Sequence, residues 1–160
     1  MHEIKEILIE EKAPFPNSRH PVLFYPQALD PAEQCFTDLF AKNGWTGIWV
    51  NGVYRYDHFH VKAHEALGCI KGWVKVRLGG PDGDTYTLKA GDAVLLPAGT
   101  GHRNIESSAD FQIVGAYPPG QSPDLQTGDM ARYDALKKQA ASLELPETDP
   151  VSGKRISWSD

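Results

Sequence analysis

Two histidines in the middle of the chain are spaced so that both rings fall on one face of a β-strand. His58 and His60 are two residues apart, and side chains at i and i+2 of a strand point the same way. Imidazoles that converge from one face are a common arrangement of metal ligands. Glu65 lies five residues after His60, an offset that a continuous strand would place on the opposite face. A hairpin loop at 61–64 removes this conflict, because it makes His60 and Glu65 a directly opposed cross-strand pair.

A second stretch supplies the fourth candidate ligand. Residues 91–99 have the pattern of a turn, a buried apolar strand and another turn, and His102 follows them. The predicted metal ligands are therefore His58, His60, Glu65 and His102. The hairpin places His64 in a loop that faces away, and the alternative is that His64 replaces Glu65 in an all-histidine site. Three imidazoles and a carboxylate suit one divalent first-row metal (Fe, Mn, Ni, Cu or Zn) and leave positions open for a substrate.

Side chains with the same strand parity should surround this metal without binding it. Tyr54 and Tyr56 precede His58 on its face, and Leu67 and Cys69 follow Glu65 on its face. We expect Tyr54, Tyr56 and Leu67 to line a pocket for a small oxygenated substrate, with core filling as the other interpretation of the tyrosines. A buried structural role is expected for Cys69.

Neighbouring charged residues are expected outside the pocket. Arg55 and Asp57 have the opposite parity and should be solvated or at an interface. Arg103 follows the last candidate ligand. It is expected to be a surface residue, with pairing to an anionic substrate as the alternative.

The elements that position these residues are short strands separated by turns. Strands are expected at 45–50, 54–60, 65–70, 73–78, 86–88, 93–96, 103–105 and 111–117, a pattern typical of an antiparallel barrel or sandwich. A short strand within 3–11 and a proline-containing arm precede them. A helix should begin at the N-cap Asp30, with Glu33 completing a capping box, and end at Gly44. A second helix is expected at 129–143, before a polar, irregular tail at 146–160.

The two histidine stretches resemble the paired motifs of the cupin superfamily. The first motif corresponds to Gly52, His58, His60, Glu65 and Gly72, and the second to Gly91, Pro97, Gly99 and His102. The chain departs from the second motif at Glu106, where the family often has asparagine; Asn104 lies nearby. The residues of both motifs resemble those of the small single-domain bacterial cupins of the YjlB type. The sequence Asp149-Pro150-Val151, near the end of the chain, resembles that group as well.

This resemblance implies an all-β, cupin-type antiparallel jelly-roll barrel in one domain, 1–160. The barrel would span about 45–118, after an arm and helix at 1–44 and before a helix and tail at 119–160. The resemblance also implies a metal-dependent function. A metalloenzyme of dioxygenase type is favoured. The alternatives are an isomerase, epimerase or lyase that uses the metal as a Lewis acid, and a non-catalytic binding module.

Composition narrows the partners and the compartment. The formal net charge is −5 and no Lys/Arg run occurs, which argues against a nucleic-acid surface. No apolar run is long enough for a membrane span, and residues 1–12 lack the pattern of a signal peptide. Cys35 and Cys69 are far apart, so a reduced, cytoplasmic protein is expected. Cupins commonly associate through their sheets, and the aromatic region around Trp45 and Trp49 adds to the expectation of a homodimer.

Overall fold

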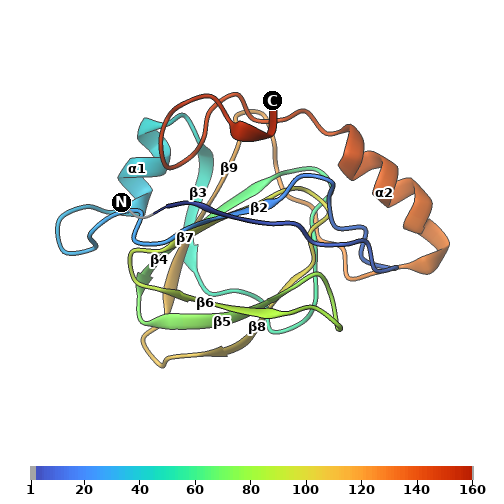
Figure 1. Cartoon of the computed structure of the whole chain (residues 1–160), viewed down its shortest axis with the longest axis horizontal. Coiled ribbons are helices and arrows are strands. Elements are labelled where there is room, and N and C mark those ends of the chain that lie inside the picture. Colours follow the sequence, from blue (N-terminus) through green and yellow to red (C-terminus); the bar gives the residue numbers. More distant parts are fainter. Residues whose placement is uncertain (1–2, 160) are drawn as a thin grey trace.

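The computed structural model describes residues 3–159 as two antiparallel β-sheets that face each other (Figure 1). The larger sheet has six strands in the order β1-β2-β7-β4-β9-β3, and the smaller has three in the order β6-β5-β8. The strands are β1 (Lys5–Ile7), β2 (Val22–Tyr25), β3 (Thr46–Asn51), β4 (Glu65–Lys71), β5 (Trp73–Leu78), β6 (Thr85–Lys89), β7 (Ala93–Leu96), β8 (His102–Ser107) and β9 (Gln112–Tyr117). The predicted all-β jelly roll is confirmed, and the N-terminal arm contributes β1 and β2 to it.

One hydrophobic core lies between the two sheets. It includes Leu67, Cys69 and Val94 from the larger sheet and Val74 and Val76 from the smaller one. Leu67 and Cys69 share this face because side chains two apart in β4 point the same way. The intervening residues of β4 belong to the opposite face. The predicted inward parity of Leu67 and Cys69 in this strand is therefore confirmed.

A second core covers the outer face of the larger sheet. The helix α1 (Phe36–Lys42) lies over this face, together with the chain after residue 145 (Figure 1). Phe36 packs where β4 has a glycine, since a Cβ atom built on Gly68 would stand 2.3 Å from the Phe36 ring. The last segment is irregular, as expected, but it is not merely a polar tail. Ile156 and Trp158 are buried, and the buried Asp149 accepts a hydrogen bond from the Tyr25 hydroxyl at 2.7 Å.

The predicted start of the first helix is wrong. The helix begins at Phe36, and its N-cap residue is Cys35, without a side-chain capping bond. Asp30 instead closes a separate turn, in which its carboxylate accepts from the Ala32 amide at 2.9 Å and its carbonyl accepts from Glu33 and Gln34. Aspartate accepts hydrogen bonds from nearby backbone amides both at helix starts and in isolated turns. The capping pattern at Asp30 therefore could not distinguish a helix from a turn.

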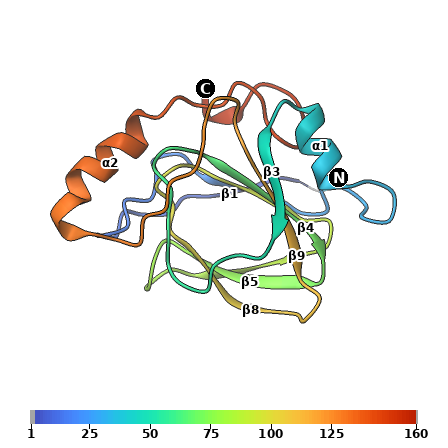
Figure 2. The same cartoon turned by 180° about the vertical axis from the view of Figure 1, so that it is seen from behind.

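The C-terminal helix is close to its predicted position. A single turn at Met130–Arg132 leads into α2 (Tyr133–Ser142), and the Asp129 carboxylate accepts from the Ala131 amide as a cap. Leu136 and Ala140 of α2 pack on Phe59 and Val61, against one end of the jelly roll. Figure 2 shows α2 at the side of the molecule, away from α1.

The predicted strand at 54–60 and the hairpin at 61–64 are wrong. After β3 ends at Asn51, residues 52–64 form no regular strand, and Glu65 pairs with Leu96 of β7 rather than with His60. The backbone around His58 makes its hydrogen bonds elsewhere. His58 forms an isolated antiparallel bridge with His102, and the His60 carbonyl accepts from the Gly99 amide at 2.7 Å.

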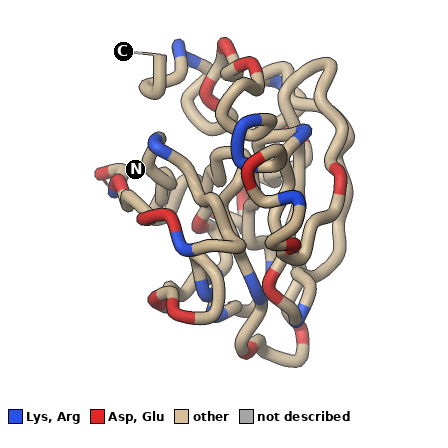
Figure 3. The backbone as a smooth tube through the Cα atoms, turned by 90° about the vertical axis from the view of Figure 1, so that its right-hand side faces the viewer, with Lys and Arg blue, Asp and Glu red and all other residues tan. Residues whose placement is uncertain are grey.

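Charged side chains anchor the same stretch from the outside. Asp57 accepts from Arg77 at 2.8 Å and lies 3.7 Å from Arg103, on neighbouring strands of the smaller sheet. Arg103 is thus paired within the chain, beside the motif that carries His102. Elsewhere, basic and acidic residues are interspersed along the backbone in the view of Figure 3. No helix within residues 3–159 has the length and apolar character needed to cross a membrane.

Candidate metal centre

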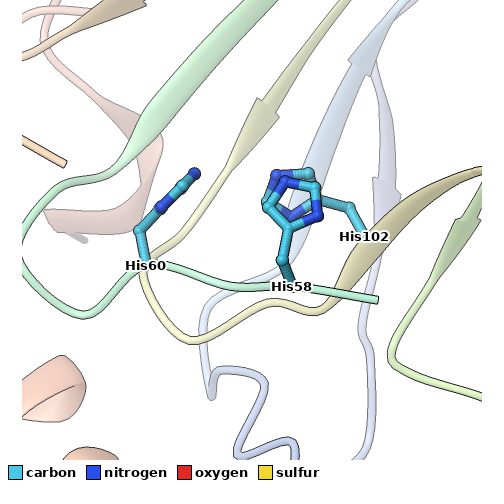
Figure 4. Close-up of side chains that lie close together, drawn as sticks. All are labelled: His58, His60 and His102. Carbon is cyan, nitrogen blue, oxygen red and sulfur yellow. The ribbon is translucent and has the colours of Figure 1, made fainter. Parts of the chain in front are cut away.

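Three imidazoles converge between the two sheets. His58, His60 and His102 each offer a ring nitrogen, and these atoms lie within 4.8 Å of one another. The ring centroids of His58 and His102 are 4.0 Å apart, and all three side chains are buried. Figure 4 shows them projecting into one space from two segments of the chain. The main-chain bridge between His58 and His102 is what brings the two segments into register.

Each imidazole is oriented by a backbone carbonyl. His58 Nδ1 lies 3.0 Å from the Tyr56 oxygen, His102 Nδ1 lies 2.9 Å from the Thr100 oxygen, and His60 Nδ1 contacts the Asp124 oxygen. A carbonyl can only accept, so Nδ1 carries the proton in all three rings. In a neutral ring of this tautomer, the Nε2 atom keeps a free lone pair. Fixing the tautomer through the second nitrogen in this way is a usual feature of histidines that bind metals.

Glu65 adds a carboxylate to the three rings. Its Oε1 atom is 3.2 Å from His102 Nε2 and 3.6 Å from His60 Nε2. Two donors that share a metal at about 2.1 Å stand about 3.0 to 3.4 Å apart, depending on the coordination angle. The observed spacing is close to this range. Glu65 is the first residue of β4, so the parity that turns Leu67 inward turns Glu65 toward the rings as well.

A metal ion would satisfy a buried atom that has no hydrogen-bond partner among residues 3–159. His102 Nε2 is fully buried and, within the described chain, makes no hydrogen bond of acceptable geometry. An unpaired buried nitrogen is costly, and a cation bonded to its lone pair removes that cost. Because the donor set is three imidazoles and one carboxylate, it fits a divalent first-row metal.

Burial and the neighbouring rings shift the acid–base properties of the cluster. Burial, and secondarily the nearby His102, lowers the pKa of His58 to about 3, so this ring is neutral at neutral pH. Burial alone would raise the pKa of Glu65, but the close approach of the His102 and His60 rings outweighs it and holds that pKa well below its usual range. Burial opposes the charged form of His60, yet Glu65 raises the pKa of His60 overall. Glu65 is therefore a carboxylate, ready to bind a cation.

The structure places His64 apart from the cluster. Its Nδ1 accepts from the Ala98 amide at 2.9 Å, and its Nε2 donates to the Glu144 carbonyl at 3.2 Å. Both ring nitrogens are thus engaged, and the ring lies near Trp158 rather than in the cluster of His58, His60 and His102. This arrangement leaves His64 no lone pair for a metal. Through these two hydrogen bonds the buried ring links the segment that follows β7 to the segment that follows α2.

A cavity of about 550 Å³ opens onto the candidate ligands. Its wall includes Tyr54 and Leu67, two of the three predicted pocket residues, but Tyr56 is not part of it. The two tyrosines stack on each other with ring centroids 4.9 Å apart and are 53% and 41% exposed. They pack edge-on against His58 at the rim of the cavity. The prediction that both tyrosines face the interior is therefore wrong. The parity argument failed because residues 52–57 are not a strand.

Two groups of cavity residues were missed by the sequence analysis. Trp49 and Tyr117 come from adjacent strands, β3 and β9, and Trp49 Nε1 donates to the Tyr117 hydroxyl at 2.7 Å. Tyr117 donates in turn to Glu65 Oε2 at 3.0 Å. Burial and the Glu65 charge raise the pKa of Tyr117 well above its usual range, so its hydroxyl stays protonated. Alternation along β9 could have placed Tyr117 on the inner face of the sheet. It could not have identified Trp49 as the donor to its hydroxyl.

The second group lies beyond the predicted barrel. Pro123, Asp124 and Leu125 form one side of the cavity. The Asp124 carboxylate accepts from the amides of Val61 and Lys62, both at 2.9 Å, while its carbonyl orients His60. No periodicity marks this segment, and its pairing with residues 58–62 is long-range. No sequence signal would have assigned it to the site.

No family model matches the chain. A search of curated proteins finds the uncharacterized protein YjlB of Bacillus subtilis (strain 168), which is 37% identical over 138 residues, 84% of this chain and 81% of the relative. Among solved structures, acireductone dioxygenase from Bacillus anthracis superposes with a TM-score of 0.40 and 17% identity, over 64% of this chain and 82% of that one. The QdtA 3,4-ketoisomerase from Thermoanaerobacterium thermosaccharolyticum superposes with a TM-score of 0.44 and 15% identity, over 87% of this chain and 97% of that one.

The two facing antiparallel sheets, with three histidines from two segments meeting between them, give this chain a fold of the cupin class. Within that class, the match along most of both chains shows that it belongs to the same family as YjlB of Bacillus subtilis.

Proposed function

We propose that this cupin binds one divalent first-row metal through His58, His60, Glu65 and His102. We further propose that it acts as a metal-dependent enzyme, of dioxygenase type, on a small oxygenated substrate. The observation that carries the proposal is the set of three converging imidazoles whose Nδ1 atoms all contact carbonyls, with the Nε2 atoms of His60 and His102 beside a buried carboxylate. When bound, the metal supplies open coordination positions and, if it is redox-active, electrons for reaction with O2.

The cavity wall favours a substrate with an apolar body and few charges. Its larger side chains include Trp49, Val53, Leu67 and Leu125, and no Lys or Arg contributes to it among the described residues. A phosphorylated or polyanionic ligand would need fixed positive charge at this wall. A compound with hydroxyl, carbonyl or carboxylate oxygens directed at the metal and carbon atoms along the wall is suited to the space.

The acid–base groups of the wall favour oxidation over isomerisation. Besides the four candidate ligands, the titratable lining residues are Tyr54, Tyr117 and Asp124. The Tyr117 hydroxyl is bonded to Trp49 and Glu65, and the Asp124 carboxylate accepts from two backbone amides and a glutamine side chain. An isomerase or epimerase needs a base and an acid within reach of the substrate. Within the described wall, only the Tyr54 hydroxyl is left for such a role.

Metal analysis tests the first part of the proposal. Protein purified without chelators should contain close to one equivalent of a first-row metal, measured by elemental analysis. His102→Ala should lose most of it, because this substitution removes one of the three rings, and that ring is only 3% exposed. His20→Gln is the matched control, since it deletes an imidazole far from the cluster in the sequence. Full metal content in His102→Ala would contradict the assignment.

Oxygen consumption tests the second part. The metal-loaded protein is incubated with compounds that carry adjacent hydroxyl, carbonyl or carboxylate oxygens on an apolar body. Uptake of O2 that depends on both compound and redox-active metal is the expected result. Turnover without O2, with Zn²⁺ or Mn²⁺, would favour the Lewis-acid alternative. A compound that binds but is not converted would indicate a binding module.

A further inference from the structure

Three side chains are linked by hydrogen bonds in a series that ends at Glu65, the candidate carboxylate ligand. Trp49 Nε1 donates to the Tyr117 hydroxyl at 2.7 Å, and that hydroxyl donates to Glu65 Oε2 at 3.0 Å. Trp49 is half-buried, and Tyr117 and Glu65 are buried. All three side chains border the cavity.

The two oxygens of Glu65 therefore have different surroundings. Oε2 accepts from Tyr117, whereas Oε1 is the atom that lies 3.2 Å from His102 Nε2 and 3.6 Å from His60 Nε2. A carboxylate with one oxygen held by a donor offers only the other oxygen to a cation in its fixed orientation. Without that donor, the carboxylate can rotate and bind through both oxygens.

A glycine in β9 makes room for Trp49, the first of these three side chains. Trp49 is paired with Gly115 across the β3–β9 ladder, and a Cβ atom on Gly115 would stand 2.1 Å from the indole ring. The glycine lets the indole lie flat against β9. From there its N–H reaches Tyr117, which is two residues further along the same face. Since this N–H supplies a donor to the Tyr117 oxygen, the tyrosine's own proton is directed to Glu65.

We propose that Tyr117 is a positioning residue that restricts Glu65 to binding the metal through one oxygen, and that Trp49 sets the direction of the Tyr117 hydroxyl. The inference rests on the proposed metal site, and it explains why Glu65 would bind the metal through one oxygen. Because Trp49 is part of the cavity wall, a molecule seated against the indole would also touch the group that orients the ligand.

Tyr117→Phe tests the inference, with Co²⁺ as a spectroscopic probe of the number and arrangement of ligands. The variant removes one hydroxyl and almost no volume. We expect Co²⁺ to bind about 10-fold more weakly, because supporting partners of metal ligands typically contribute a factor of this size. The visible absorption bands of the bound Co²⁺ should also change in position and intensity, because Glu65 can then bind through both oxygens.

Tyr25→Phe is the matched control. It also removes a buried hydroxyl that donates to a carboxylate, that of Asp149, but on the outer side of the larger sheet. Any loss of thermal stability should be comparable in the two variants, whereas the Co²⁺ spectrum and Kd should change only in Tyr117→Phe. Trp49→Phe keeps Tyr117 and removes only its donor, so it should shift the spectrum in the same direction by a smaller amount. It also provides the test if Tyr117→Phe does not fold.

The outcomes separate this inference from the proposed function. If the wild-type protein binds no Co²⁺, both are overturned. If the wild type binds Co²⁺ and His102→Ala does not, the metal site stands. An unchanged spectrum and Kd in Tyr117→Phe, or in Trp49→Phe where the first variant is unfolded, would then refute the positioning role alone.

Discussion

Replacing Glu65 by glutamine should largely abolish the stabilisation that a metal confers on this protein. Glu65 is 4% exposed, and its Oε1 atom lies 3.2 Å from His102 Nε2. Glutamine keeps the size of the side chain but removes the negative charge that offsets the cation. Loss of a group that merely supports a ligand costs about 10- to 100-fold in metal affinity, so loss of the ligand's charge should cost at least about 100-fold.

Linkage converts this loss into a change in melting temperature. At a free Co²⁺ concentration of about 100 times the wild-type Kd, binding stabilises the native state by about 2.7 kcal/mol. At the same concentration a variant with about 100-fold weaker binding gains about 0.4 kcal/mol. For a chain of this size each kcal/mol moves Tm by about 2 to 4 °C. Co²⁺ should therefore raise Tm by about 5 to 11 °C in the wild type and by about 1 to 2 °C in Glu65→Gln.

The assay is thermal unfolding of metal-free protein with and without Co²⁺. Glu106→Gln is the control, because it neutralises an exposed carboxylate whose partner, Lys75, is 3.9 Å away on the surface of the smaller sheet. Its metal-induced shift should equal that of the wild type. A full wild-type shift in Glu65→Gln would refute the conclusion that this carboxylate binds the metal.

Three further predictions concern pH, packing and assembly. Burial lowers the pKa of His64 to about 4 from 6.5. The unfolded chain binds this proton first, so the unfolding free energy should fall by about 3 kcal/mol as pH drops from 6.5 to 4. His64→Gln should flatten this part of the profile in denaturant titrations of metal-free protein, and an equally steep profile would argue against it. Gly115→Ala places a Cβ 2.1 Å from Trp49 and should destabilise the fold by about 1 to 3 kcal/mol, whereas Gly52→Ala, with its nearest contact at 3.9 Å, should change it little. Denaturant midpoints compare the two, and equal effects would contradict the packing argument. We also expect a homodimer, so light scattering should give twice the chain mass of 17.7 kDa, and a monomer mass would refute this.

The sequence predicted most where local alternation decides which face a residue occupies. Glu65 and Leu67 are two apart in a regular strand, and both turn inward as expected. The order of strands and turns also predicted an antiparallel barrel or sandwich, because short strands at close spacing leave few other architectures. The resemblance of the two histidine motifs to those of cupins specified the jelly roll. The four candidate ligands are brought together, although the predicted hairpin between His60 and Glu65 does not form.

The predictions failed where tertiary contacts replace regular pairing. Tyr54 and Tyr56 were assigned to the interior from strand parity, but Asp57 is held by Arg77, twenty residues further on, and the segment follows an irregular path. Trp158 was placed in a polar tail, yet it is buried and donates to the Pro21 carbonyl at 2.8 Å, 137 residues away. Such contacts depend on which surfaces meet, and alternation along the chain carries no information about them.

The three imidazoles differ in how their orientation is achieved, and this has a consequence for the whole site. His58 and His102 are each oriented by a carbonyl two residues earlier in the same segment. His60 instead depends on the carbonyl of Asp124, in a segment that follows the last strand of the jelly roll. The Asp124 carboxylate, through its hydrogen bond from the Val61 amide, holds this segment against the residues that follow His60. Docking of the segment therefore completes the ligand set and one wall of the cavity together. A metal that binds the completed set must stabilise the docked segment by the same free energy with which docking strengthens metal binding.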